Sequence, residues 1–213
     1  MSTLSLFTSQ AGTTCCPVRG MSGACFSKDR RFRYALWRRW AEGQTIAFLM
    51  LNPSVADEDQ LDNTLRRCQG SAHELGYAGF EVANVFPLVS TDRSQVLKNE
   101  DRDGEDKRNH EHIADMLGRC GALVLGFGHE VERKQLRYVL RELRMLFEKL
   151  EKSGMPQPSA LRVTDHGLPQ HPLYLPKGLV PQPYTTWPEW TNFDVGLTAA
   201  TPRADGAGAQ EER

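Results

Sequence analysis

The sequence predicts an α/β protein, a single-domain three-layer sandwich with a mostly parallel central sheet. Short apolar runs at 45–51, 80–85 and 122–127 each end in a loop, and helical patterns separate them. Apolar runs of this length that alternate with amphipathic helices are typical of parallel strands covered on both faces. The chain has 213 residues, of which 39% are hydrophobic and 25% charged, which is enough for one sizeable core.

The individual elements follow from periodicity and turn residues. Alternation at 32–40 predicts a strand with Tyr34, Leu36 and Trp40 on one face, and Gly76 is the expected C-cap of the first helix. In chain order, we expect strands at 24–26, 32–40, 45–51, 80–85, 122–127 and 161–163, and helices at 61–75, 107–117 and 130–152. The predicted domain organisation is a loose lead-in at 1–23, the α/β domain at 24–191 and a disordered tail at 192–213.

The composition excludes some classes of function. The formal net charge is -1, so the chain lacks the strong positive field behind tight non-specific nucleic-acid binding. No apolar run approaches the roughly 20 residues that a membrane-spanning helix needs, and no secretory signal pattern is present. The five cysteines include adjacent Cys15 and Cys16 but show no disulfide or zinc spacing. We therefore expect reduced thiols, a cytoplasmic location and no membrane partner.

Arginines crowd two segments of this otherwise balanced chain. They are Arg30, Arg31, Arg33, Arg38 and Arg39 in the first segment, and Arg66 with Arg67 in the second. A local basic patch on either segment would suit a nucleic-acid partner. We favour the alternative, that both segments form solvated faces.

An abrupt change from apolar to polar residues ends the strand at 45–51. Asn52 and Pro53 follow it, and an acidic loop with Asp57 and Asp62 precedes the next helix. Pro53 keeps Asn52 out of the helical region, so the chain leaves the strand sharply. The Asn52 amide can both donate and accept, which suits it to position a water or a polar substrate group. The alternatives are that Asn52 satisfies turn backbone and that Asp62 is a helix N-cap, which we favour for Asp62.

Two later loops place a polar residue close to a proline after an apolar run. Asn84 precedes Pro87, and a neutral amide there can read a nucleobase or carbonyl edge. His171 precedes Pro172, where an imidazole can donate to developing negative charge without acting as a base. Each also has a purely structural interpretation, as a turn-stabilising side chain. Because open α/β sheets bind ligands at the carboxyl ends of their strands, we expect the three loops to form one site.

Other motifs give weaker signals. Gly126 and Gly128 follow a strand, but Val131 stands where a dinucleotide fingerprint has its third glycine. The chain has no GxxxxGK loop and no GxSxG elbow. His110 and His112 are two residues apart on a predicted helix, so their side chains point apart. We therefore expect neither a cofactor nor a metal.

Four long motifs carry a family resemblance. They are RYALWRRW at 33–40, FLMLNPSVADEDQLDNTLRRC at 48–68, GYAGFEVANVFPLVSTD at 76–92 and GLPQHPLYLP at 167–176. Together they resemble the DUF1643 family of bacterial and phage proteins, whose function is not established. The resemblance runs from about residue 24 to residue 176.

The order of the loop motifs is also similar to that of the uracil-DNA glycosylase superfamily. That resemblance implies a glycosylase-like fold and hydrolysis of an N-glycosidic bond in DNA or a nucleotide. Asn52 would place the attacking water, Asn84 would contact the base and His171 would stabilise the departing base. Asp57 or Asp62 would stabilise a cationic sugar. The residues expected to contact substrate are Pro53, Ser54, Asn84, Phe86, Pro87 and Tyr174.

This chain departs from the glycosylase pattern after the His-Pro motif, where Leu173 and Tyr174 replace a small residue. The segment from Pro176 to Gly178 is also a poor version of a minor-groove loop. A single strand or a nucleotide is therefore the better expected partner than duplex DNA, which would require base flipping. Two rival interpretations remain: a non-catalytic module that binds a nucleotide or modified base, and an interaction protein that docks a partner on the helix at 130–152.

Overall fold

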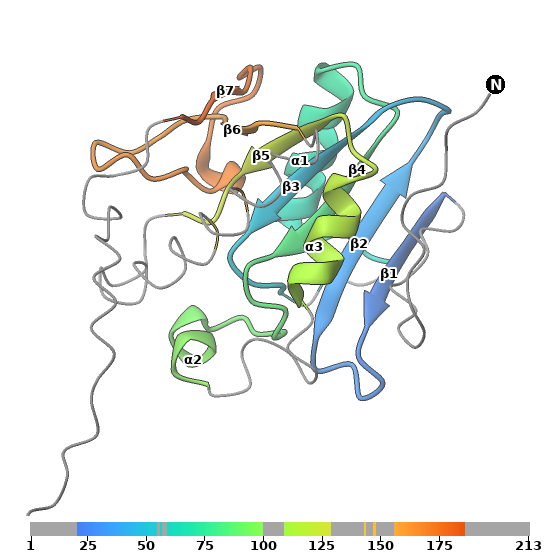
Figure 1. Ribbon diagram of the computed structural model, residues 1–213, viewed down its shortest axis with the longest axis vertical. Helices are drawn as coiled ribbons and strands as arrows, with labels where there is room; N and C mark the ends of the chain where they lie inside the picture. The colour runs from blue at the N-terminus through green and yellow to red at the C-terminus, as the bar shows by residue number, and fades with distance from the viewer. Residues whose placement is uncertain are drawn as a thin grey trace, which may run out of the picture.

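The computed structural model describes residues 21–54, 56, 59–99, 109–128, 143, 147 and 156–185. Within these residues one seven-stranded sheet runs in the order β1-β2-β4-β3-β5-β6-β7 (Figure 1). Its strands are β1 (Ser22–Phe26), β2 (Arg33–Arg39), β3 (Thr45–Met50), β4 (Gly79–Asn84), β5 (Ala122–Leu125), β6 (Pro158–Ala160) and β7 (Gln182–Pro183). The helices are α1 (Asn63–Glu74), α2 (Arg93–Lys98), α3 (Asn109–Leu117) and the 3₁₀ turn η1 (Pro172–Tyr174).

The sheet is mixed, so the prediction of a mostly parallel sheet is wrong. Strands β4, β3, β5 and β6 are parallel neighbours, whereas β1–β2, β2–β4 and β6–β7 pair antiparallel. A short turn is enough to connect the antiparallel neighbours β1 and β2, while the parallel core needs long crossovers. Apolar alternation reports which face a side chain takes and carries no information on strand direction. The α/β class itself is confirmed.

Helices α1 and α3 cover opposite faces of the sheet, with α3 in front and α1 behind in Figure 1. Buried residues of α1, such as Leu65, pack with Phe48 and Met50 of β3. Buried residues of α3, such as Ile113, pack with Leu49, the β3 residue between those two. Successive strand residues point to opposite faces, so these two clusters form a core on each side of the sheet.

Several boundaries differ from the predicted ones. The strand expected at 161–163 lies three residues earlier, at β6, and neither α2 nor β7 was expected. Gly76 stands just past the end of α1 with φ 78°, as the helix end requires. Residues 1–20 of the lead-in predicted at 1–23, most of the predicted helix at 130–152 and the predicted tail at 192–213 lie outside the described residues. Strand β1 begins at Ser22, within the predicted lead-in.

A β-bulge in β2 places Arg33 and Tyr34 on the faces of the sheet opposite to those that plain alternation assigns to them. Cys25 and Phe26 of β1 pair with Ala35 and Arg33, so Tyr34 is an extra residue in β2. Tyr34 and Ala35 therefore both pack on the α3 side, where the Tyr34 ring stacks on His112 at 4.3 Å. Leu36 packs on the α1 side, so the prediction that Tyr34 and Leu36 share a face is wrong. Bulges re-aim neighbouring side chains in this way, and here the affected neighbour is Arg33.

The expectation of reduced thiols holds for Cys68 and Cys120, which are free and buried, and is wrong for Cys25, which is disulfide-bonded. Disulfide formation depends on the spatial approach of two cysteines, and the spacing of cysteines in this sequence gave no signal of it.

Among the described residues, no helix combines the length and the apolar character that crossing a bilayer demands.

Candidate functional site

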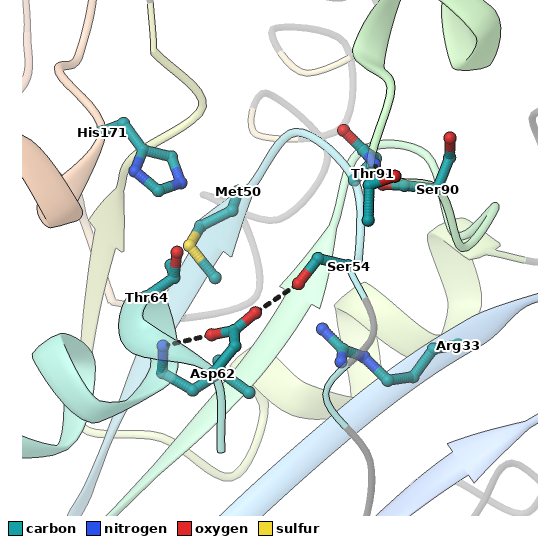
Figure 2. A pocket seen from close by; sticks show the side chains of 10 residues that line it. Arg33, Met50, Ser54, Asp62, Thr64, Ser90, Thr91 and His171 are labelled. Atoms are coloured by element: carbon teal, nitrogen blue, oxygen red, sulfur yellow. Dashed lines mark hydrogen bonds between the residues drawn. The ribbon is translucent and has the colours of Figure 1, made fainter. Parts of the chain in front are cut away.

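A polar pocket of about 260 Å³ opens at the carboxyl end of β3 (Figure 2). Its walls come from four parts of the fold: the end of β3 with the loop that follows, the start of α1, the loop after β4, and the turn before η1. A further side chain comes from the start of β2. The lining residues are Arg33, Met50, Asn52, Ser54, Asp62, Thr64, Leu65, Ser90, Thr91 and His171.

The topology explains why a pocket forms here. From β3 the chain crosses by α1 to β4 on one side, and it then returns by α3 to β5 on the other side. From the carboxyl end of β5 the chain goes on to β6, away from β3, so the connections that leave the neighbouring strands β3 and β5 diverge at this edge of the sheet. Open α/β sheets bind ligands at such a switch point. The volume falls slightly below the roughly 300–1,000 Å³ of sites for drug-sized ligands, which suits a small ligand or one residue of a larger one.

Asn52 is fixed by the backbone of two loops. Its Nδ2 group donates to the carbonyl oxygen of Ser90 at 2.8 Å and to that of Pro53 at 3.1 Å. The Ser90 amide in turn donates to the Pro53 carbonyl at 3.0 Å. Asn52 therefore does stabilise the turn, and it also lines the pocket. Because Nδ2 donates to the backbone, Oδ1 is the Asn52 atom that can accept a hydrogen bond from a water or a ligand.

Asp62 is the N-cap of α1, as predicted. Its Oδ1 accepts from the Leu65 amide at 2.8 Å, and its Oδ2 accepts from the Ser54 hydroxyl. Figure 2 shows both hydrogen bonds, with the carboxylate on the pocket wall between the two partners. One carboxylate thus caps the helix, fixes the loop after β3 and places a negative charge in the pocket.

His171 reaches the pocket because its turn packs closely against the end of β5. The Gly128 amide donates to the Pro169 carbonyl at 3.0 Å, and Gly128, with φ 79°, lies against the His171 Cβ. The Leu173 amide donates to Nδ1 of His171 at 3.3 Å. An accepting Nδ1 carries no proton in the neutral imidazole, so this contact assigns the proton to Nε2. His171 can therefore donate a hydrogen bond from Nε2.

Replacing Gly126 by Ala should destabilise the protein by about 1–3 kcal/mol, the usual cost of overpacking. A Cβ at this position would lie 2.7 Å from Cδ of Pro172, so the turn that carries His171 would have to move. Urea denaturation of Gly126→Ala measures the cost. Gly70→Ala is the control, since nothing lies within 4 Å of its new Cβ and the helix should gain stability. Wild-type stability in Gly126→Ala would contradict the close packing of the turn on β5.

Arg33 is buried, with 2% of its surface exposed, and it lines the pocket. Its Nη1 donates to the Ala56 carbonyl at 2.6 Å. Figure 2 shows the guanidinium directed towards Ser54 and Asp62. The interpretation of this arginine as part of a solvated face is therefore wrong. Arg67 is not part of a solvated face either. It donates to the Leu175 carbonyl and so connects α1 to the turn that carries His171.

The structure brings together four of the residues predicted to form a site. Asn52, Ser54, Asp62 and His171 line the pocket, and Pro53 is buried between the first two. The other expected contact residues are not among the lining residues: Phe86 and Pro87 are buried, Asn84 is 1% exposed, and Tyr174 is 68% exposed. Asp57 lies outside the described residues. The roles assigned to all of them stay predictions.

Asn84 lies close to the pocket without lining it. It pairs in register with Met50, so the two side chains share the α1 face of the sheet, and Met50 lines the pocket. Neither amide atom of Asn84 has a hydrogen-bond partner within the described part of the chain. A buried, unpartnered amide is costly, which makes Asn84 a candidate ligand contact behind the flexible Met50 side chain.

The free thiols are poor nucleophiles. Burial raises the pKa of the Cys120 thiol to about 12, with a smaller contribution from the charge of Glu81. Burial likewise raises the pKa of Cys68, and the Asp62 carboxylate adds to the effect. Both thiols therefore stay protonated at neutral pH. In the described portion of the chain, no group of three or more His, Cys, Asp or Glu is arranged to hold a metal.

Sequence reasoning missed six of the ten lining residues, namely Arg33, Met50, Thr64, Leu65, Ser90 and Thr91. Ser90 and Thr91 belong to a loop that follows a predicted strand, and this position is a signal that could have found them. Thr64 and Leu65 stand at the predicted start of a helix beside Asp62. Arg33 had no such signal, because the bulge reverses the face that alternation assigns to it.

Comparison with family models matches residues 33–173 to a family described as "Protein of unknown function (DUF1643)". Searches of curated proteins and of solved structures returned no match. The likeness to the uracil-DNA glycosylases thus rests on the sequence motifs alone. The matched segment covers well over half of the chain and contains all ten lining residues of the pocket, from Arg33 to His171. The chain therefore belongs to the DUF1643 family.

Proposed function

We propose that the pocket is the active site of a hydrolase that cleaves the N-glycosidic bond of a nucleotide or of a residue in single-stranded DNA. The observation that carries this proposal is the meeting of Asn52, Asp62 and His171 in one pocket at the switch point of the sheet. These groups supply an acceptor that can hold a water, a negative charge and a hydrogen-bond donor. Hydrolysis of a glycosidic bond uses that combination.

In the proposed reaction, Asn52 Oδ1 accepts a hydrogen bond from the attacking water. The water oxygen bonds to the anomeric carbon while the bond from that carbon to the base nitrogen breaks, and the electron pair leaves with the base. The Asp62 carboxylate stabilises the positive charge on the sugar and takes up the proton that the water loses. His171 donates from Nε2 to the departing base, where negative charge develops.

The proposed role of Asn84 is to read the base. Its amide offers a donor and an acceptor side by side, which suits an edge that presents the same pair. The Met50 side chain lies beside it in register and would have to change rotamer to admit the base. Methionine has three rotatable bonds and adapts readily, and pairing with a ligand would relieve the buried, unpartnered Asn84 amide.

Base release tests the proposal directly. The full chain is incubated with single- and double-stranded oligonucleotides bearing deaminated, oxidised or alkylated bases, followed by alkali, and with nucleotides followed by chromatography of free bases. We expect release from at least one substrate, and a loss of about 100- to 1,000-fold in Asn52→Ala, comparable to the loss of one transition-state contact. Asn63→Ala is the matched control, because Asn63 is exposed and contacts Arg66 outside the pocket. No release across the panel would reject the proposal.

A binding module is the second candidate, and a specific observation favours it. Both Asp62 oxygens accept hydrogen bonds from the protein itself, and the Asn52 amide holds two loops together. Such groups can shape a binding pocket without doing chemistry. Calorimetry with the same nucleotides separates the two functions: a module binds its ligand and releases no base.

A further inference from the structure

A stacked pair of side chains, Phe26 and Arg30, stands on the hairpin between β1 and β2. The central carbon of the Arg30 guanidinium lies 4.0 Å from the centre of the Phe26 ring. Cation–π attraction at this distance holds the guanidinium over the ring. Phe26 is half-buried and Arg30 is exposed, so the stacked pair forms an ordered surface that solvent and a ligand can reach.

The stacked pair lies beside the pocket, on the same face of the sheet. Phe26 pairs in register with Arg33, and residues directly opposite each other on two strands share a face. Arg33 lines the pocket. The hairpin also lies at the carboxyl end of β4, where the pocket opens, because β2 runs antiparallel to β4 (Figure 1). The backbone connects the two directly: the Val89 amide donates to the Arg31 carbonyl at 2.9 Å, and Val89 precedes Ser90 of the pocket wall.

The turn holds Arg30 in an unfavourable backbone conformation. Among the described residues it is the one non-glycine residue with a positive φ, 60°, a region that glycine adopts at lower cost. The Arg30 amide donates to the Ser27 carbonyl at 2.9 Å. The Ser27 hydroxyl donates to Oδ1 of Asp29 at 2.7 Å, and the Arg31 amide donates to the same atom at 3.1 Å. Strain that the surrounding structure maintains is typical of functional positions, which points to a role for the Arg30 side chain.

The charge of the hairpin suits a chain of phosphates. Lys28, Arg30 and Arg31 are exposed cations at its tip. The acid among them is Asp29, whose Oδ1 is engaged inside the turn. Proteins that bind single strands combine cations along the phosphates with aromatic and arginine side chains on which bases stack. The hairpin presents both kinds of group next to one pocket.

We propose that the stacked pair is a platform for the base that neighbours, along a nucleic-acid strand, the residue held in the pocket. The inference rests on the proposed function in that the pocket takes a nucleotide residue, and it names the partner as a single strand. A free mononucleotide has no neighbouring base to place on the platform. In a duplex the neighbouring base is already stacked and paired, so a single strand is the better partner.

The experiment is calorimetric titration of the full chain with the four 5′-deoxymononucleotides and the four homotrinucleotides. We expect at least one trinucleotide to bind about 10- to 100-fold more tightly than its mononucleotide, the range for stacking of one base. A trinucleotide that keeps its phosphates but lacks the two flanking bases should lose most of this gain. The ribonucleotide forms of the same trinucleotides distinguish an RNA strand from a DNA strand.

Two variants of the stacked pair separate stacking from charge. Arg30→Lys keeps the positive charge but loses the planar group, and Phe26→Leu keeps an apolar side chain but loses the ring. Each should lower the affinity for the trinucleotide about 10-fold and leave that for the mononucleotide unchanged. His73→Ala is the matched control, which should change neither affinity. His73 stacks on Trp40 with 3.7 Å between ring centroids, and Trp40 follows β2 at the opposite edge of the sheet.

Equal affinity for mononucleotides and trinucleotides, or no binding of either, would overturn the platform. A gain that survives both removal of the flanking bases and Arg30→Lys would assign it to phosphate charge and would overturn the platform as well. Arg30→Lys decides alone if Phe26→Leu does not fold, because Arg30 is exposed. The outcome is separable from that of the proposed function. A trinucleotide gain without base release supports the platform and rejects the hydrolase, and base release from mononucleotides without a trinucleotide gain does the reverse.

Discussion

Replacing His171 by Ala is expected to slow base release by about 100- to 1,000-fold, the usual effect of removing one donor to a developing anion. The Leu173 amide donates to Nδ1 and so assigns the proton to Nε2, which makes Nε2 the donor to the departing base. The loss should appear in kcat rather than in KM, because the interaction forms as charge develops on the base. Rates of base release measured over a range of substrate concentrations separate the two constants.

Two further substitutions distinguish this chemical role from the structural one. His171→Asn keeps an acceptor where Nδ1 stands and so retains the turn that begins at Pro172, but it removes the Nε2 donor. His171→Gln places an amide donor near the position of Nε2. We expect the Asn variant to be as slow as the Ala variant with wild-type thermal stability, and the Gln variant to be faster than both. An Asn variant with full activity would assign His171 to the turn alone.

The largest effect on stability is expected on the other side of the sheet. Arg119 donates from Nη2 to Oε2 of Glu81 at 2.9 Å, and the Glu81 side chain is 1% exposed. Replacing Arg119 by Met would leave a buried carboxylate without this partner. The free energy of unfolding should fall by about 3 kcal/mol, the lower end for breaking a buried pair, because Arg119 itself is about a third exposed.

Denaturant unfolding of Arg119→Met, of Glu81→Gln and of the double variant checks this expectation. The double variant removes both charges, so most of the loss in Arg119→Met should be recovered. A loss below about 1 kcal/mol in Arg119→Met would show that the pair behaves as an ordinary surface ion pair.

The central strands and the position of the pocket were predictable because both depend on local patterns. The apolar runs that became β3, β4 and β5 are short and bounded by turn residues. The two ends of α1 also carry local signals. Asp62 has a side chain that can accept a hydrogen bond at the N-cap, and a glycine follows the last turn of the helix. Asn52 and His171 were found because each follows an apolar run beside a proline, and the topology then brought them together.

Strand direction, the Cys25 disulfide and the placement of Arg33 depend on partners distant in sequence, and no local pattern reports them. Asn84 shows that a local pattern can be present without the side chain reaching the pocket. It satisfies the local rule as well as Asn52 does, yet its side chain is buried beside Met50 instead of lining the pocket. The rule places a residue at the edge of the sheet, and packing then decides whether it reaches the cavity.

The extra residue in β2 separates two features of the strand that lie next to each other in the sequence. Tyr34 stacks on His112 on the α3 side, and Arg33 lines the pocket on the other side. Removing Tyr34 would restore plain alternation and leave Arg33 and Ala35 on the faces that they already take, so the cation would stay in the cavity and the stacked ring would be lost. Related chains can therefore lack a residue at this position and still place an arginine in the pocket.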